Sequence, residues 1–119
     1  MKKWLVGTAV VTASALAAVS LAFAGSTTLF KISASKTSLA YNKKVLTAKT
    51  GKVTIVMTNP SFLSHDVAIK GNGVRVKGKV VGKGGTSRVT ANLKPGTYTF
   101  YCTVPGHEAA GMKGKLIVK

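Results

Sequence analysis

The chain has very few cysteine and acidic side chains. Among its 119 residues Cys102 is the only cysteine, and Asp66 and Glu108 are the only carboxylates against 18 lysine and arginine residues. A single thiol excludes an intramolecular disulfide. If the domain is exported to a compartment where disulfides are usual, the presence of Cys102 therefore calls for another explanation. The net charge of +16 favours association with anionic surfaces, whether acidic proteins, lipid headgroups or nucleic acid.

Arginine is also scarce, which bears on the choice among these partners. Only two of the 18 basic residues are arginine, and no aromatic residues alternate with the basic ones to offer stacking surfaces for bases. This pattern disfavours nucleic-acid binding. Acidic protein partners and association with a membrane surface both stay open.

Residues 1–24 have the pattern of a secretory signal peptide. Lys2 and Lys3 precede an uncharged, mostly apolar run, and Ala22-Phe23-Ala24 offers the small-x-small pattern of a cleavage site. The alternative is an uncleaved anchor, because the uncharged run of 21 residues is about as long as the ~20 that span a bilayer. Either way we expect the domain at 25–119 to lie outside the cytoplasm, periplasmic or secreted, and cleavage would lower the net charge to +14.

The region 25–119 lacks any long helical period and reads as all-β. Short runs of β-branched and aromatic residues alternate with turn signals such as Gly71-Asn72-Gly73 and Lys94-Pro95-Gly96. They predict one domain, a Greek-key β-sandwich or barrel of about seven to eight strands. The expected strands are 29–33, 39–41, 52–58, 65–69, 73–81, 86–91, 97–102 and 114–118.

The period of two along a strand predicts which side chains face the core. Cys102 shares a face with Tyr98 and Phe100, and His65 shares one with Val67 and Ile69, which leaves Asp66 on the opposite side. Met112 begins a further apolar stripe on the last strand. The same argument places Val53, Ile55 and Met57 in the core without any further role.

Three residues with metal-binding side chains follow one another in a short loop. Cys102, His107 and Met112 are spaced as C-x4-H-x4-M, and His65 is the only other histidine. A thiolate, two imidazoles and a weak thioether form a blue-copper site. Taken singly, each residue has a plainer explanation, as a surface histidine, a core methionine or an inert thiol. Taken together they predict one copper ion bound by all four.

The run 95–114, Pro-Gly-x-Tyr-x-Phe-Tyr-Cys-x-x-Pro-Gly-His-x-x-x-Gly-Met-x-Gly, resembles the C-terminal copper loop of the cupredoxins, especially that of rusticyanin-like and plastocyanin-like proteins. The resemblance implies a Greek-key sandwich, with His65, Cys102 and His107 as equatorial ligands and Met112 as the axial ligand. It also implies that electrons enter and leave near His107. The family often has Asn where this chain has Asp66. An Asp there could accept N–H bonds from the facing copper loop, and its negative charge would favour Cu(II).

These observations predict a small exported electron carrier that is not an enzyme. Both histidines are already used as ligands, so the chain has no further histidine cluster for a multicopper centre. We expect a monomer that exchanges single electrons with redox partner proteins whose surfaces are acidic. Two alternatives are copper delivery or storage and binding of polyanions. The scarcity of carboxylates further suggests work in an acidic medium, since few groups are left for acid to protonate.

Overall fold

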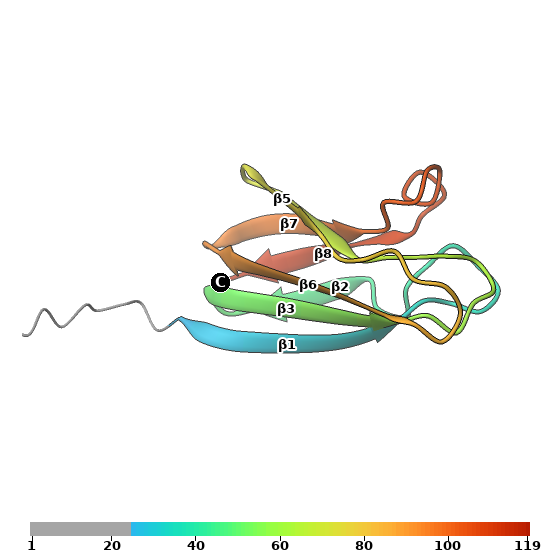
Figure 1. Ribbon diagram of the computed structural model, residues 1–119. Helices are drawn as coiled ribbons and strands as arrows, with labels where there is room; N and C mark the ends of the chain where they lie inside the picture. The colour runs from blue at the N-terminus through green and yellow to red at the C-terminus, as the bar shows by residue number, and fades with distance from the viewer. Residues whose placement is uncertain (1–24) are drawn as a thin grey trace, which may run out of the picture.

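The computed structural model describes residues 25–119, which form a sandwich of two β-sheets (Figure 1). The expected leader at 1–24 lies outside the described residues. One sheet has the strand order β1-β3-β6 and the other β2-β8-β7-β4-β5. The strands are β1 (Ser26–Ser33), β2 (Val45–Ala48), β3 (Gly51–Thr58), β4 (Ala68–Gly71), β5 (Val74–Lys77), β6 (Thr86–Leu93), β7 (Gly96–Tyr101) and β8 (Lys113–Val118). Over residues 25–119 there is no helix long and apolar enough to cross a membrane.

The core lies between the two sheets, where the inward side chains of both pack together. Along β6 exposed and buried residues alternate strictly, as expected for a strand with one solvent face. The fully buried positions of β3 include Met57, so its prediction as a core residue is confirmed. The inward residues of β3, β6 and β7 are Val53, Ile55, Met57, Ser87, Val89, Ala91, Leu93, Tyr98 and Phe100.

The chain crosses repeatedly between the sheets. β1 pairs with β3 and β2 pairs with β8, both in parallel, whereas the remaining pairs are antiparallel. Parallel neighbours cannot be joined by a tight hairpin, and β2, which connects β1 to β3 along the chain, lies in the other sheet. The predicted all-β sandwich is therefore confirmed.

Three of the expected strands, 39–41, 65–69 and 73–81, differ clearly from the observed ones. Residues 39–41 form no strand, and Tyr41 makes only a single bridge with Ala34. The chain instead adds β2 at the sheet edge, a four-residue strand that the sequence analysis missed. The expected strand 73–81 stops at Lys77, and beyond it only the Gly78 N–H, which donates to the Val67 carbonyl, and the bridge between Val81 and His65 continue the pairing.

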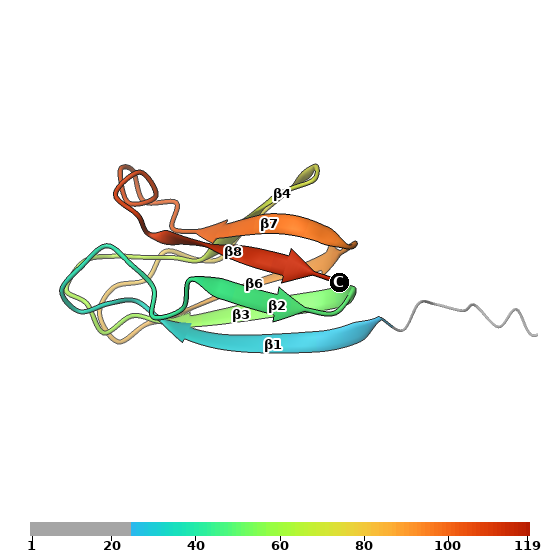
Figure 2. The same ribbon diagram turned by 180° about the vertical axis from the view of Figure 1, so that it is seen from behind.

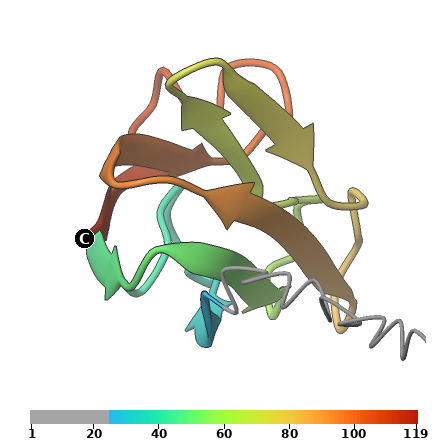
Figure 3. The ribbon, with the colours of Figure 1, turned by 90° about the vertical axis from the view of Figure 1, so that its left-hand side faces the viewer.

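The longest loops gather at one end of the sandwich, opposite the C-terminus (Figures 1 and 2). They are the segment between β1 and β2, the segment between β3 and β4, and the segment between β7 and β8. Figure 3, turned by a quarter, shows the β4–β5 hairpin above β6. The residues expected to bind metal all belong to, or border, this loop end.

Candidate metal centre

The loop after β7 is closed by main-chain hydrogen bonds that bring its two ends together. Tyr101 pairs with Lys113 across β7 and β8. One residue further on, the Cys102 N–H donates to the Met112 carbonyl at 3.1 Å, and the Met112 N–H donates to the His107 carbonyl at 3.0 Å. Cys102, His107 and Met112 are thus held next to one another by backbone geometry alone.

His65 reaches the same place from the other side of the loop end. It precedes β4 and forms a two-way bridge with Val81, in which the N–H of each residue donates to the carbonyl of the other at 3.0 and 2.8 Å. The expected strand 65–69 begins only at Ala68, so this bridge, rather than a regular ladder, fixes the His65 backbone. Its Nε2 lies 3.3 Å from the Ser61 hydroxyl, which orients the ring.

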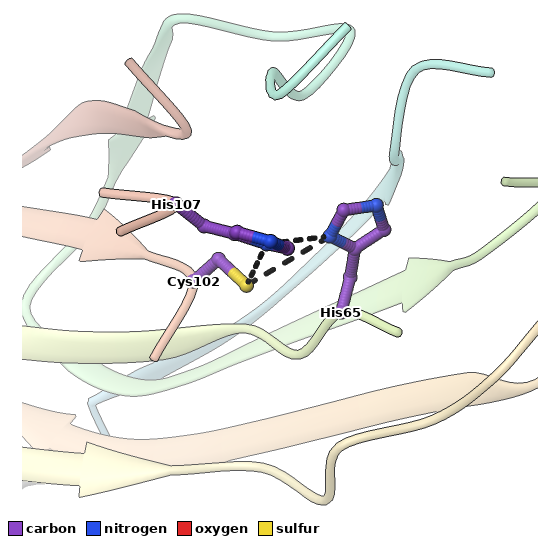
Figure 4. A group of neighbouring side chains, drawn as sticks. All are labelled: His65, Cys102 and His107. Atoms are coloured by element: carbon purple, nitrogen blue, oxygen red, sulfur yellow. Dashed lines mark hydrogen bonds between the residues drawn. The ribbon is translucent and has the colours of Figure 1, made fainter. Parts of the chain in front are cut away.

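Three donor atoms converge at the centre of the loop end (Figure 4). The Nδ1 atoms of His65 and His107 are 3.2 Å apart, and the Cys102 Sγ lies 3.9 Å from the first and 3.6 Å from the second. Three donors bound to one transition-metal ion at about 2.0 to 2.3 Å lie roughly 3.5 Å from one another. The three side chains therefore fit a single ion without rearrangement.

Burial differs sharply among the four predicted residues. His65, Cys102 and Met112 are at most 1% exposed, whereas His107 is half-buried. Of the four, His107 is therefore the residue that solvent and other molecules can reach directly. Met112 belongs to the same apolar cluster as Cys102, in agreement with its predicted inward face.

Burial favours the neutral forms of Cys102 and His65 in the absence of metal. Burial raises the pKa of the Cys102 thiol above its ordinary value. Burial, and then the neighbouring His107, lower the pKa of His65. A neutral imidazole can bind metal at once, whereas the thiol must release its proton, so metal affinity increases with pH.

The alternation argument was wrong about Asp66, which is fully buried rather than facing away from the core. Residues 65–67 are not part of a regular strand, so a period of two does not apply there. The Asp66 Oδ1 accepts the Thr103 N–H at 2.6 Å, and its Oδ2 accepts the Thr103 hydroxyl. The expected bond from the facing loop is therefore present, and it links the residue after His65 to the residue after Cys102.

Two further residues support the centre that the sequence analysis did not identify. Asn59 is buried and donates through Nδ2 to the carbonyls of Leu63 and Val81, at 2.8 and 2.9 Å. The Tyr41 hydroxyl donates to the Asp66 carbonyl at 2.6 Å. Asn59 stands before Pro60, a dipeptide typical of turns, whereas no local pattern marks Tyr41.

Comparisons with known proteins agree with this geometry. A family model described as copper binding proteins of the plastocyanin/azurin family matches residues 28–119. A structure of dithionite-reduced auracyanin from Roseiflexus castenholzii is similar with a TM-score of 0.70 and 32% identity, covering 79% of this chain and 98% of that one. The structure of auracyanin A from Chloroflexus aurantiacus, described as a "blue" copper protein, is similar with a TM-score of 0.69 and 26% identity, covering 79% of this chain and 100% of that one.

A curated relative matches over a shorter stretch. Rusticyanin from Acidithiobacillus ferrooxidans is 53% identical over 38 residues, which are 32% of this chain and 24% of rusticyanin. The match thus spans about a quarter of that protein. Given the family match over most of its length, the chain belongs to the plastocyanin/azurin family of copper-binding proteins, the cupredoxins, and its cofactor is copper.

Proposed function

We propose that this chain is an electron carrier that holds one copper ion through His65, Cys102, His107 and Met112. The convergence of two imidazole nitrogens and one thiol sulfur within 3.9 Å of one another supports this most directly. When bound, copper supplies a one-electron Cu(I)/Cu(II) couple. The chain transforms no substrate in this proposal, because its two histidines are both used as ligands.

The surrounding residues hold the donors in place and exclude water. Main-chain bonds fix Cys102 and Met112, and the bridge to Val81 fixes His65. A site whose donors are held in this way changes little between oxidation states, which keeps electron exchange fast. The half-buried His107 is the side of the centre on which a redox partner can come close.

The first test is a visible and EPR spectrum of the protein with one equivalent of Cu(II), compared with the Cys102→Ser variant. We expect an intense thiolate-to-copper band that bleaches reversibly with ascorbate and is absent from the variant. A colourless complex, or one that loses copper quickly to a weak chelator, would instead favour copper delivery or storage.

The role of Met112 is tested by a matched pair of substitutions. Met57 and Met112 are both fully buried methionines, but only Met112 adjoins the proposed ligands. Met112→Leu should alter the visible and EPR spectra, whereas Met57→Leu should leave both unchanged. Equal spectra for the two variants would remove Met112 from the ligand set.

We further propose that the protein is exported as a monomer, with residues 1–24 as its leader. The basic start, the apolar run and the Ala22-Phe23-Ala24 pattern support this. Trp4 is the only tryptophan, so an exported protein without indole fluorescence has lost its leader, and one that retains it is anchored.

A further inference from the structure

The outer face of the five-stranded sheet is strongly basic. Lys70 pairs with Arg75 across β4 and β5, and Tyr101 pairs with Lys113 across β7 and β8. Paired residues share a face, and in β7 Tyr98 and Phe100 occupy the inner one. The outward cationic side chains of these strands are therefore Lys70, Arg75, Lys77, Lys113 and Lys115. We call these five residues and the surface between them the basic sheet face.

Two hollows indent this face. The larger, of about 580 Å³, lies between β5 and the copper loop and is lined by Arg75, Lys77 and the segment 101–106. The smaller, of about 370 Å³, is lined by Lys113 and Lys115 with residues of β7. In Figure 1 the face is the upper side of the sandwich, next to the loop that follows β7.

Glu108 separates the two hollows and shows how the face holds a carboxylate. It lines both of them and forms an ion pair with Lys70 at 2.5 Å. The Lys70 ammonium also lies 4.3 Å from the centre of the Tyr101 ring. The other four cations of the face have no acidic partner within the described residues.

We propose that the basic sheet face is the docking surface for a redox partner protein that presents acidic side chains. This rests on the proposed electron transfer, and it adds the location and the chemistry of the partner. Carboxylates projecting into the two hollows would meet Arg75 and Lys77 on one side and Lys113 and Lys115 on the other. The partner would then lie next to the copper loop, whose residues 102–106 line the larger hollow.

The shape of the face favours a protein over the other anionic partners. A flat bilayer would reach only the tips of the lysines and leave the hollows empty. A single-stranded nucleic acid binds largely by stacking its bases on exposed aromatic side chains, but Tyr101 is only 6% exposed and is covered by Lys70.

The test maps where an acidic chain binds to the copper(I)-loaded protein, which is diamagnetic. We would titrate poly-L-glutamate into isotopically labelled protein at low salt and follow the amide shifts. We expect the shifts to cluster on β4, β5, β7 and β8. Shifts spread equally over both sheets, or confined to the loop between β3 and β4, would overturn the proposal.

A matched pair of double variants separates this face from general charge. Arg75→Gln/Lys77→Gln removes one arginine and one lysine from the basic sheet face. Arg88→Gln/Lys52→Gln removes the same two types from exposed positions on the three-stranded sheet. We expect Arg75→Gln/Lys77→Gln to weaken the binding of poly-L-glutamate roughly tenfold, and Arg88→Gln/Lys52→Gln to weaken it less than about twofold. Equal weakening would overturn the proposal.

A second double variant and a comparison with lipid vesicles extend this test. If the first variant does not fold, Lys113→Gln/Lys115→Gln repeats the test at the smaller hollow. Tighter binding of phosphatidylglycerol vesicles than of poly-L-glutamate at the same face would overturn the choice of a protein partner. The visible band and its bleaching by ascorbate, measured on the same variants loaded with Cu(II), report the electron-transfer function separately, so either proposal can fail alone.

Discussion

At the scale of single residues, Asp66 carries the strongest consequence for the metal centre. Both of its carboxylate oxygens accept hydrogen bonds, and both bonds come from Thr103. It has no cationic partner within the described residues. Both oxygens therefore act as acceptors, and Asp66 places a carboxyl group without a cationic partner one residue away from His65.

Replacing Asp66 by Asn should raise the reduction potential. The amide oxygen can still accept the Thr103 N–H, but the negative charge that stabilises Cu(II) is lost. At the effective dielectric constant of a protein interior, the loss of a charge this near to the metal amounts to about 2 kcal/mol, or on the order of 100 mV. Voltammetry measures the change. Glu108→Gln is the control, because that charge is already paired with Lys70 and partly exposed, and an equal shift in both variants would contradict the assignment.

Gly114 shows how tightly the strand after the copper loop is packed. A Cβ there would come within 2.2 Å of the Phe100 ring and 2.7 Å of the Lys44 carbonyl. Gly114→Ala should therefore destabilise the fold by about 1 to 3 kcal/mol. Gly82→Ala is the matched control, since nothing lies within 4 Å of its added Cβ. Urea unfolding of both metal-free variants measures the difference, and similar stabilities would contradict the packing argument.

At the scale of elements, the segment between β1 and β2 is attached to the metal centre through one side chain. The Tyr41 ring packs against Phe100 with centroids 5.6 Å apart, and its hydroxyl donates to the Asp66 carbonyl. Burial, then the negative charges that Cys102 and Asp66 can carry, raise the pKa of Tyr41 far above its ordinary value of 10.0. The neutral phenol is thus part of the native structure.

This attachment predicts a loss of stability in alkali. Because the folded pKa of Tyr41 is raised, its contribution is complete below about pH 10 and is lost as the pH rises above that value, where only the unfolded chain ionises readily. Tyr41→Phe should cost about 1 kcal/mol at neutral pH but should lose less stability above pH 10. Urea unfolding of the metal-free proteins over this range is the measurement, and parallel pH profiles would contradict the prediction.

The elements that the sequence predicted are those with a clear period or a clear boundary. β6 alternates strictly between buried and exposed residues, β3, β7 and β8 bury every second side chain over most of their length, and turn signals separate most of these strands. β2 was missed because it has only four residues, lies between lysines and is defined by its partner β8. A partner far along the chain leaves no local signal.

The same distinction applies to the candidate site. Cys102 and both histidines could be predicted because their side chains are rare in this chain and their chemistry is specific. The inward position of Asp66 could not, because it depends on Thr103, thirty-seven residues away. The hydroxyl contact of Tyr41 is likewise a product of the tertiary fold.

At the scale of the whole molecule, acidic groups are confined to the metal end. Asp66 is bonded to the copper loop and Glu108 belongs to it, while the described lysines and arginines are distributed over both sheets. Acid unfolding mainly reflects the protonation of carboxylates with native partners. In this protein only two such groups can contribute.

The stability of the metal-free protein should therefore depend on pH in an unusual way. Burial lowers the folded pKa of His65 below its ordinary value of 6.5. Its contribution is complete above about pH 6.5 and is lost as the pH falls through the lower folded value, because the unfolded chain binds the proton first. Below that range we expect only a shallow decline. Urea unfolding from about pH 8 to about pH 3 tests this, and a steep loss centred near pH 4 would contradict it.

The parallel pairing of β2 with β8 sets the order in which the metal centre can form. Val45 joins Lys115 in this pair, and β8 also closes the loop that carries Cys102, His107 and Met112. Contacts between such distant parts of a chain form late and slowly during folding. A partly folded chain therefore lacks a complete set of donors. When copper is added during refolding, the thiolate-to-copper absorption band should appear only after β8 has docked.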